Sequence, residues 1–467
     1  MRRLRIRLFG QFVHVSIVAL AVLEAAICFA APFVAVYIRF AGEVTPKTYA
    51  TFTPGAIAYA VAMVPSMIAM GLYAFQQRAQ SAGIALRLIA AALVATLVLA
   101  VVVFFFPSVD FGRGVLAWTI VVSTLACFTV RMLFMFAVSE EALKRRVLVF
   151  GAGQRAQAIT QLRRRTDRRG FNVLGFIRPA DSELLIDADR LIESDKSLYD
   201  LVCERDVSEV VVALDDRRGN FPVEELLNCR LRGIDVIDIV SFLERETGKV
   251  RVDMLSPSWI IFSAGFRRDP FRQGLERGFD ILVSMLLLAA TWPLMVLAWL
   301  AIKLEDGWSA PVLYRQIRVG LEGKLFTLRK FRSMRLDAEA DGKAQWATKN
   351  DSRVTMVGSV IRKTRIDELP QLINVLVGDM CFVGPRPERP QFVDEFSERI
   401  PYYRERHWVK PGITGWAQLC YPYGASERDA KEKLQYDLYY VKHRNLMFDL
   451  FILLQTAEVI LWGRGAR

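Results

Sequence analysis

The chain has 467 residues, of which 53% are hydrophobic, and its formal net charge is +12. Its apolar residues gather in long uncharged runs, which indicates a membrane protein rather than a wholly water-soluble one. Basic flanks of membrane segments explain the positive charge, so nucleic acid is not expected as a partner. The six cysteines include no C-x-x-C pair, which argues against a disulfide framework or a zinc site.

Four apolar runs follow an arginine-rich N-terminus, at about 12–38, 54–75, 88–106 and 115–138. Each is long enough to cross about 30 Å of hydrocarbon at about 1.5 Å per residue. Basic residues are concentrated before the first run, in the second connection and after the fourth, so the N-terminus and everything after Lys144 should be cytoplasmic. Glu24 and Arg131 lie inside spans. We interpret both as packing against a neighbouring helix, with a functional role as the alternative.

A soluble α/β segment comes next, in which strand-like runs alternate with helical patterns. The runs lie at 147–150, 173–177, 210–214 and 234–239. This alternation predicts a Rossmann-like parallel sheet. The first run enters a G-x-G-x-x-A turn with Gly151 and Gly153, where backbone N–H groups could bind a phosphate. Because no acid follows the second strand to hold a ribose, the turn fits either a nucleotide site or tight helix–strand packing.

A fifth apolar run, 281–302, has Pro293 near its middle. Its length alone suggests a span. However, basic residues flank both ends, and a spanning helix would place one basic group outside. A proline interrupts the helical ladder and permits a sharp kink. We therefore expect a re-entrant helix–break–helix that enters one leaflet and returns. The last apolar segment, 446–462, contains acidic and amide residues and is interpreted as an interfacial amphipathic helix, with a core-facing helix as the alternative.

Two adjacent carboxylates, Asp367 and Glu368, precede apolar residues at helical spacing from Leu369 to Leu376. Pro370 is tolerated in a first helical turn, so both acids are expected at a helix N-terminus. They could simply cap that helix. A helix N-terminus also attracts phosphate, and basic residues are numerous nearby in the sequence. These are Lys330, Arg332, Arg353, Arg362, Arg365 and Arg386.

Paired carboxylates in a basic cluster on a membrane-bound domain suit phosphoryl transfer between a soluble donor and a lipid phosphate. One carboxylate can attack phosphorus while the other binds a divalent metal that reduces charge repulsion. Arg386, between Pro385 and Pro387, could hold phosphate oxygens bidentately; a rigid structural turn is the alternative.

Four motifs in this order resemble the bacterial sugar transferase family of polyprenyl-phosphate hexose-1-phosphate transferases. They are KFRSM at 330–334, DELPQL at 367–372, GPRP at 384–387 and KPGITGWAQ at 410–418. The segments CYPYGAS at 420–426 and LQYDLYYVKH at 434–443 are most similar to the branch associated with exosortase/PEP-CTERM exopolysaccharide loci. The resemblance covers the whole chain.

The resemblance implies a four-helix transmembrane bundle, a Rossmann-like α/β domain and an α/β monotopic phosphoglycosyltransferase domain with a re-entrant membrane helix. In the family's re-entrant helix a serine usually pairs with the proline; here Trp292 precedes Pro293, and Thr291 is near enough to substitute. The expected boundaries are 1–143 for the bundle, 144–255 for the Rossmann-like domain, 256–278 for a basic connector, 279–304 for the re-entrant helix and 305–467 for the catalytic domain.

The resemblance also implies an activity, the transfer of a hexose 1-phosphate from a UDP-sugar to undecaprenyl phosphate with release of UMP. This is an initiating step of exopolysaccharide synthesis at the cytoplasmic face of the bacterial inner membrane. Asp367 matches the nucleophile that forms a phosphosugar–aspartate intermediate, and Glu368 matches the acid that binds Mg²⁺. A homodimer is a further expectation. The expected substrate-binding residues are Lys330, Arg332, Arg353, Arg386, Lys410 and Thr414.

Two other functions stay open on the residues alone. The first is a glycosyltransferase that moves sugar without phosphate. The second is a catalytically inactive membrane scaffold whose Rossmann-like domain senses a nucleotide.

Overall fold

The computed structural model of the chain divides into two compact units, Met1–Thr247 and Gly248–Arg467, which are described separately. The structure describes residues 5–8, 11–40, 46–73, 81–109, 112–137, 144–162, 167, 170–179, 183–194, 196–216, 221–255, 270–336, 338, 351–421, 424 and 426–462. Most of the expected basic connector, 256–269, and part of the motif at 420–426 lie outside these residues.

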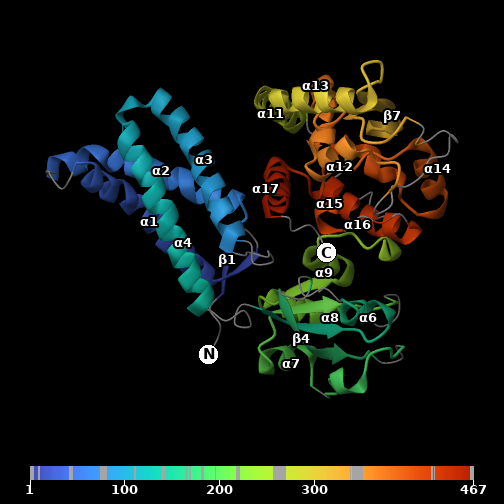
Figure 1. Cartoon of the computed structure of the whole chain (residues 1–467). Coiled ribbons are helices and arrows are strands. Elements are labelled where there is room, and N and C mark those ends of the chain that lie inside the picture. The colour runs from blue at the N-terminus through green and yellow to red at the C-terminus, as the bar shows by residue number, and fades with distance from the viewer. Residues whose placement is uncertain are drawn as a thin grey trace. The chain divides into compact units, whose positions relative to one another are not determined.

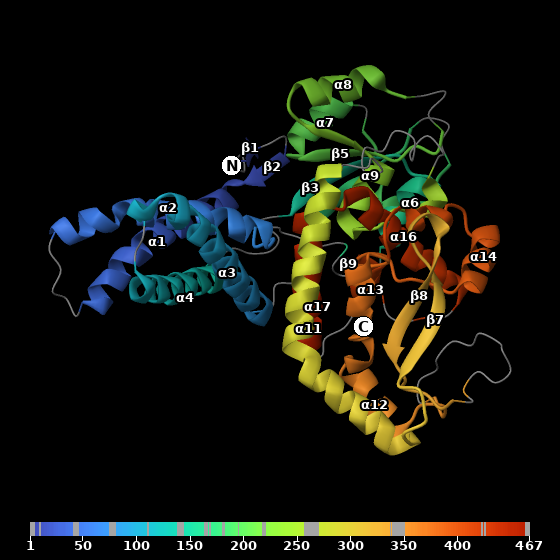
Figure 2. The ribbon, with the colours of Figure 1, turned by 90° about the horizontal axis from the view of Figure 1, so that it is seen from above.

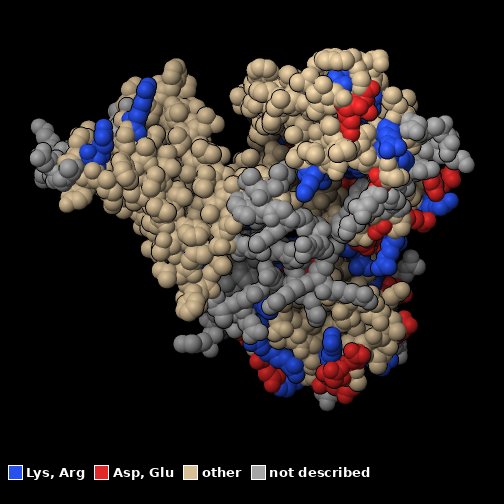
Figure 3. Space-filling model, viewed as in Figure 1, with Lys and Arg blue, Asp and Glu red and all other residues tan. Residues whose placement is uncertain are grey.

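The first unit begins with a short hairpin and four long helices (Figure 1). The helices pack in a ring, α1 against α2 and α4, and α3 against the same two. All four are long and apolar enough to cross a membrane. On the face seen in Figure 3 these helices carry few charged side chains. This confirms the predicted N-terminal bundle. The bounds are β1 Arg5–Leu8, β2 Gln11–His14, α1 Val15–Arg39, α2 Pro46–Ala69, α3 Ser81–Phe105, η1 Pro107–Val109 and α4 Arg113–Ala137.

The two charged residues expected inside spans contact each other between α1 and α4. Arg131 Nε lies 2.7 Å from Glu24 Oε1, and its NH2 group donates to Glu24 Oε2, also at 2.7 Å. Tyr73 donates to the same carboxylate, and Arg131 NH1 donates to the carbonyl of Leu72. Both charged side chains are buried. The packing interpretation is therefore confirmed, because each charge is satisfied by the other and by hydrogen bonds.

The α/β part of the first unit contains a four-stranded sheet in the order β4-β3-β5-β6, with every neighbouring pair parallel. Helices α7 and α8 contact each other, as do α6 and α9. The predicted Rossmann-like sheet is confirmed. Bounds are β3 Arg145–Phe150, α6 Gln154–Thr160, β4 Phe171–Ile177, η2 Ala188–Arg190, α7 Leu198–Glu204, β5 Glu209–Val212, α8 Val223–Leu231, β6 Asp235–Asp238 and α9 Ile239–Thr247.

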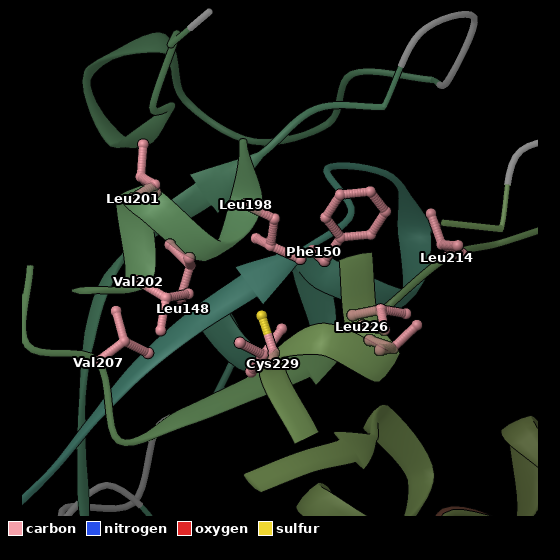
Figure 4. Close-up of a cluster of buried hydrophobic side chains, with 11 residues drawn as sticks. Leu148, Phe150, Leu198, Leu201, Val202, Val207, Leu214, Leu226 and Cys229 are labelled. Carbon is pink, nitrogen blue, oxygen red and sulfur yellow. The ribbon is translucent and has the colours of Figure 1, made fainter. Parts of the chain in front are cut away.

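Alternate residues of the central strand β3 point to opposite faces of the sheet. Leu148 and Phe150 pack with Leu198 of α7 and Leu226 of α8 in one buried cluster (Figure 4). On β4, the Phe171 ring meets Phe242 of α9 edge to face. The continuous apolar runs in the sequence are thus typical of parallel strands that are covered on both sides.

The second unit contains a long apolar helix, α11, which spans Pro270–Asp306 and bends along its length (Figure 2). The sequence suggested a break at Pro293, but the helix continues through this residue. A proline removes one hydrogen bond of the ladder, and a bend is enough to accommodate its ring. The hydroxyl of Thr291 donates to the carbonyl of Leu287, one turn earlier, at 2.7 Å. Many apolar side chains of α11 are exposed, including Leu286, Trp292, Leu297 and Leu304.

The rest of this unit is built from short elements around α13 and α16. The antiparallel hairpin β7–β8 lies against α13, and the parallel pair β9–β10 contacts α17. The remaining bounds are η3 Val252–Met254, β7 Leu313–Val319, η5 Leu321–Gly323, β8 Leu325–Phe331, α12 Met356–Lys363, η6 Ile366–Glu368, α13 Gln371–Val377, β9 Cys381–Val383, α14 Pro390–Arg399, η7 Arg404–Trp408, β10 Gly412–Thr414, α15 Trp416–Cys420, α16 Glu427–His443 and α17 Leu446–Trp462.

Helix α17 was expected to lie in the membrane interface. Its residues Asp449, Phe451 and Ile452 are instead buried, and Tyr440 of α16 donates to Asp449. This part of the helix faces the core of the second unit, which was the alternative interpretation. Asp449 thus has a buried hydrogen-bond partner, so this acidic residue does not mark a solvent-exposed face.

Candidate active site

The two adjacent carboxylates lie on η6, a single 3₁₀ turn between α12 and α13. Neither caps α13, as the sequence had allowed, because the N-cap is Pro370 and no side chain bonds the helix N-terminus. Arg365, just before the turn, has a left-handed backbone with φ of 61°. Such a conformation costs a non-glycine residue about 1–3 kcal/mol and is common at functional sites.

Asp367 is buried, with 8% of its surface exposed. Its Oδ1 atom has no hydrogen-bond partner among the described residues. Burial, and then the neighbouring charge of Glu368, raise the pKa of Asp367 above that of an ordinary aspartate. A buried carboxylate oxygen without a partner costs free energy, so it marks this atom as a candidate for chemistry.

Glu368 differs from its neighbour because three cations surround one of its oxygens. Lys330 Nζ lies 3.1 Å, Arg386 NH2 3.3 Å and Arg365 NH1 3.7 Å from Glu368 Oε1. Burial alone would raise the pKa of Glu368, but these three charges outweigh it and lower the pKa to about 2. The pKa of Asp367 is therefore raised while that of the neighbouring Glu368 is lowered. Such a difference is typical of two acids with different roles in catalysis.

Lys330 reaches Glu368 because Asn374 holds α13 against β8. The amide nitrogen of Asn374 donates to the carbonyl of Thr327 at 2.7 Å, and its oxygen accepts from the N–H of Arg329 at 3.1 Å. The Asn374 side chain thus forms hydrogen bonds with backbone groups of β8 in the way that a neighbouring strand would. Sequence reasoning missed Asn374, although a lone amide inside the apolar run Leu372–Leu376 was a usable signal.

Replacing Asn374 with leucine should destabilise the second unit, since it leaves one N–H and one carbonyl of β8 unsatisfied. We expect a loss of about 1–3 kcal/mol. Thermal unfolding of the purified protein would measure this loss. The matched control is Gln391→Leu, because Gln391 is exposed in the first turn of α14 in the same unit. A smaller loss for Asn374→Leu than for the control would contradict the anchoring role.

Both ends of the membrane helix α11 hold the elements that flank η6. Near its start, Arg277 donates to the carbonyls of Val375 and Leu376 at the C-terminal end of α13. Near its end, Glu305 accepts from the first two N–H groups of α12, at 2.8 and 3.1 Å. A carboxylate at a helix N-terminus and a cation at a C-terminus both complement the helix dipole. The carboxylate pair is thus positioned by the membrane helix.

Arg386 belongs to the loop between β9 and α14 and joins the site from another part of the chain. Besides its contact with Glu368, it donates to Gln418 of α15 at 3.0 Å. The loop approaches the segment at 410–415 so closely that a Cβ on Gly384 would lie 2.4 Å from the carbonyl oxygen of Lys410. Glycine at 384 therefore allows two sequence motifs to meet.

Three other predicted binding residues have local partners instead. Arg332 pairs with Asp306 at the end of α11, at 2.6 Å. Arg353 forms a two-pronged contact with Asp351, at 2.6 and 2.8 Å. The Thr414 hydroxyl lies 2.8 Å from that of Thr456 in α17.

Lys410, the fourth, lines a cavity of about 430 Å³ beside the first turns of α11. Its Nζ atom is near the C-terminal end of α13, the end opposite to the carboxylate pair. The structure therefore brings together Asp367, Glu368, Lys330 and Arg386. Within the described part of the chain, the contacts seen for Arg332, Arg353, Lys410 and Thr414 are with other residues.

The glycine-rich turn of the Rossmann-like sheet contains a carboxylate of the same unit. Asp215 accepts from the N–H groups of Gln154 and Arg155 at the start of α6, at 2.9 and 2.8 Å. A Cβ on Gly153 would lie 1.8 Å from this carboxylate, and one on Gly151 would lie 2.3 Å from the carbonyl of Ala213. These contacts match the packing interpretation of the turn, because Asp215 uses the N–H groups that a phosphate would need.

A magnesium ion would have few protein ligands at the carboxylate pair. Among the described residues, no group of three or more histidine, cysteine or acidic side chains could hold a metal. Within the described part of the chain, Asp367 Oδ1 has no hydrogen-bond partner, and Glu368 supplies a second carboxylate. Magnesium commonly binds one or two carboxylates together with substrate phosphates and water, so the residues fit it in that mode.

Comparison with known proteins places these two units in a family. The family described as "Bacterial sugar transferase" matches residues 271–463, and the one described as "CoA-binding domain" matches residues 68–220. The undecaprenyl-phosphate galactose phosphotransferase of Salmonella typhimurium is 30% identical over 339 residues, which cover 69% of each chain. The chain belongs to the bacterial sugar transferase family.

Other bacterial sugar transferases match parts of the chain. The UDP-N-acetylgalactosamine-undecaprenyl-phosphate N-acetylgalactosaminephosphotransferase of Aeromonas hydrophila is 43% identical over 54% of this chain and 58% of its own length. The UDP-glucose:undecaprenyl-phosphate glucose-1-phosphate transferase of Xanthomonas campestris is 41% identical over 40% of this chain and 39% of its own. The chain thus spans between about two fifths and 69% of these three relatives.

Proposed function

We propose that this bacterial sugar transferase moves a hexose 1-phosphate from a UDP-sugar to undecaprenyl phosphate and releases UMP. The observation that carries the proposal is the buried Asp367 carboxylate. Its Oδ1 has no hydrogen-bond partner among the residues that the structure describes, and the neighbouring Glu368 is surrounded by three cations. The names of the relatives support the substrate class, since they are undecaprenyl-phosphate sugar phosphotransferases.

The proposed reaction has two displacements at one phosphorus. A carboxylate oxygen of Asp367 attacks the sugar-bearing phosphorus, and the bond from that phosphorus to the bridging oxygen breaks, so UMP leaves. An oxygen of the lipid phosphate then attacks the same phosphorus, and the carboxylate leaves unchanged. Lys330, Arg365 and Arg386 neutralise phosphate charge near Glu368. Bound Mg²⁺, held by Glu368 and phosphate oxygens, would supply further charge neutralisation.

The proposed topology keeps this chemistry in one leaflet. Helix α11 enters the membrane from the cytoplasmic side of the inner membrane and returns, which its bend and its basic flanks support. Single cysteines at Ser309 and near Arg78 should then be labelled from the same side. Labelling of a Ser309→Cys variant from the periplasmic side alone would contradict this topology.

A panel of UDP-sugars tests the function with detergent-solubilised full-length protein and undecaprenyl phosphate. With a donor labelled in the sugar-linked phosphate, we expect UMP release and label in the lipid product. Release of UDP with unlabelled lipid would instead indicate transfer of the sugar alone. Removal of divalent cations with EDTA should stop UMP release, and added Mg²⁺ should restore it. The C-terminal motifs at 420–426 and 434–443 support a place for this step in exopolysaccharide synthesis.

The activity should rise with pH through the raised pKa of Asp367, because only the ionised carboxylate attacks phosphorus. Glu368, with its pKa of about 2, stays ionised and adds no second acid limb. The pH profile of kcat/KM measures the pKa of the free enzyme. Glu368→Gln should move the limb of the residual activity to lower pH, since a neighbouring negative charge is lost, and Lys330→Met should move it to higher pH. If wild type, Glu368→Gln and Lys330→Met all gave the same apparent pKa in the pH profile, Asp367 would not be the group whose ionisation controls the activity.

A further inference from the structure

The loop that carries Arg386 is held at four successive carbonyl groups. The carbonyls of Pro385 and Glu388 accept backbone N–H groups from Gly412 and Val319, both at 3.0 Å. The carbonyl of Arg386 accepts from Arg406 NH2 at 3.0 Å, and that of Pro387 accepts from an Arg318 guanidinium at 2.9 Å. The two prolines have no N–H group, so this stretch of backbone is almost fully constrained.

Arg406 is the more deeply buried of the two arginines that hold this loop. Its side chain is 5% exposed and lies 2.8 Å from the 3% exposed carboxylate of Asp437 in α16. It also donates to the hydroxyl of Tyr403 at 3.0 Å. A buried arginine paired with one acid is often neutral or unfavourable for stability when compared with an apolar pair. Stability therefore does not explain why a buried arginine is directed toward the loop that carries Arg386.

Resting on the proposed function, we propose that Arg406, fixed by Asp437, is a positioning residue that holds the Arg386 backbone so that the Arg386 guanidinium meets the donor phosphates. Arg406 itself need not touch substrate, because its NH2 group already serves a carbonyl and a carboxylate. An arginine suits this task, since its planar fork donates in several fixed directions at once. Arg318 acts on the next carbonyl and is partly neutralised by Glu388, 3.7 Å away.

The test is a cycle of variants in the full-length protein. Arg406→Gln combined with Asp437→Asn removes both buried charges together and so avoids an uncompensated one. We expect UMP release to fall by about 10²-fold, because small misplacements of a positioning group have effects of this size. In an Arg386→Ala background the same double change should have less than about a twofold further effect. An equal loss in both backgrounds, or no loss in either, would overturn the proposal.

Hydrogen exchange gives a readout that does not depend on activity. The segment 384–389 should exchange faster in the Arg406→Gln/Asp437→Asn protein than in wild type. Lys249→Met is the matched control, because Lys249 forms an ion pair, at 2.7 Å, with Glu432 of α16, the helix that also carries Asp437. If wild-type protein releases no UMP with any UDP-sugar of the panel, the proposed function fails. Unchanged hydrogen exchange at 384–389 in the double variant would separately refute the positioning role of Arg406.

Discussion

An Asp367→Asn protein should release UMP at least about 10³-fold more slowly than wild type, since an amide is a poor nucleophile toward phosphorus. Asn is nearly isosteric with Asp, and Asp367 Oδ1 has no hydrogen-bond partner among the described residues. The fold should therefore persist. The free energy of unfolding should even rise slightly, because the substitution removes a buried carboxylate whose pKa is raised by its burial.

The measurement is single-turnover UMP release together with thermal unfolding of the same preparation. Asp379→Asn is a matched control, as Asp379 follows the far end of α13. Wild-type protein incubated with donor alone should release about one UMP per active site in a burst, and Asp367→Asn should show none. Retention of more than about a tenth of the wild-type rate by Asp367→Asn would exclude this carboxylate as the nucleophile.

Loss of either partner of the Glu24–Arg131 pair should destabilise the helix bundle by about 3–5 kcal/mol, since the remaining charge is buried without compensation. Glu24→Gln and Arg131→Met are the single changes. The combined change should be less damaging than the sum of the two, because no buried charge remains. Tyr73 contacts both partners, as a hydrogen-bond donor to Glu24 and through its ring to Arg131.

Thermal unfolding in detergent would measure these changes as shifts of Tm. The control is Arg113→Gln, because Arg113 is exposed at the start of α4. If the double variant is no more stable than the worse single variant, the pair is not the main contribution of these residues. Transferase activity is a second readout, since the bundle and the carboxylate pair belong to different compact units.

The segments of the fold were predictable because their signals are local. Membrane helices follow from runs of apolar residues, and parallel strands from short β-branched runs between helical patterns. The bundle and the sheet are therefore where the sequence placed them. A break at Pro293 was expected, but α11 continues through this residue, because whether a helix continues past a proline depends on the packing around it. The role of α17 also depended on packing, since buried partners of Asp449 come from another helix.

The chemical character of the site was also visible in the sequence, in the pair Asp367–Glu368, the basic residues and the proline-flanked Arg386. Which cations reach the pair was not. Lys330, Arg365 and Arg386 converge on Glu368, while Arg332 and Arg353 are neutralised by Asp306 and Asp351. Proximity in sequence does not decide among arginines, because each side chain pairs with whichever carboxylate the fold brings within reach.

By itself, then, the sequence determined the membrane segments, the Rossmann-like sheet and the two carboxylates of the opening turn before α13. Only the tertiary structure decided that Asp215 fills the glycine-rich turn and that Asn374 and Arg406 support the site. The physical reason is the distance along the sequence over which each kind of interaction acts. Apolar periodicity and turn chemistry act between neighbours. The pairing of polar groups instead depends on residues that meet only in the folded chain, as Glu24 and Arg131 do across 107 positions.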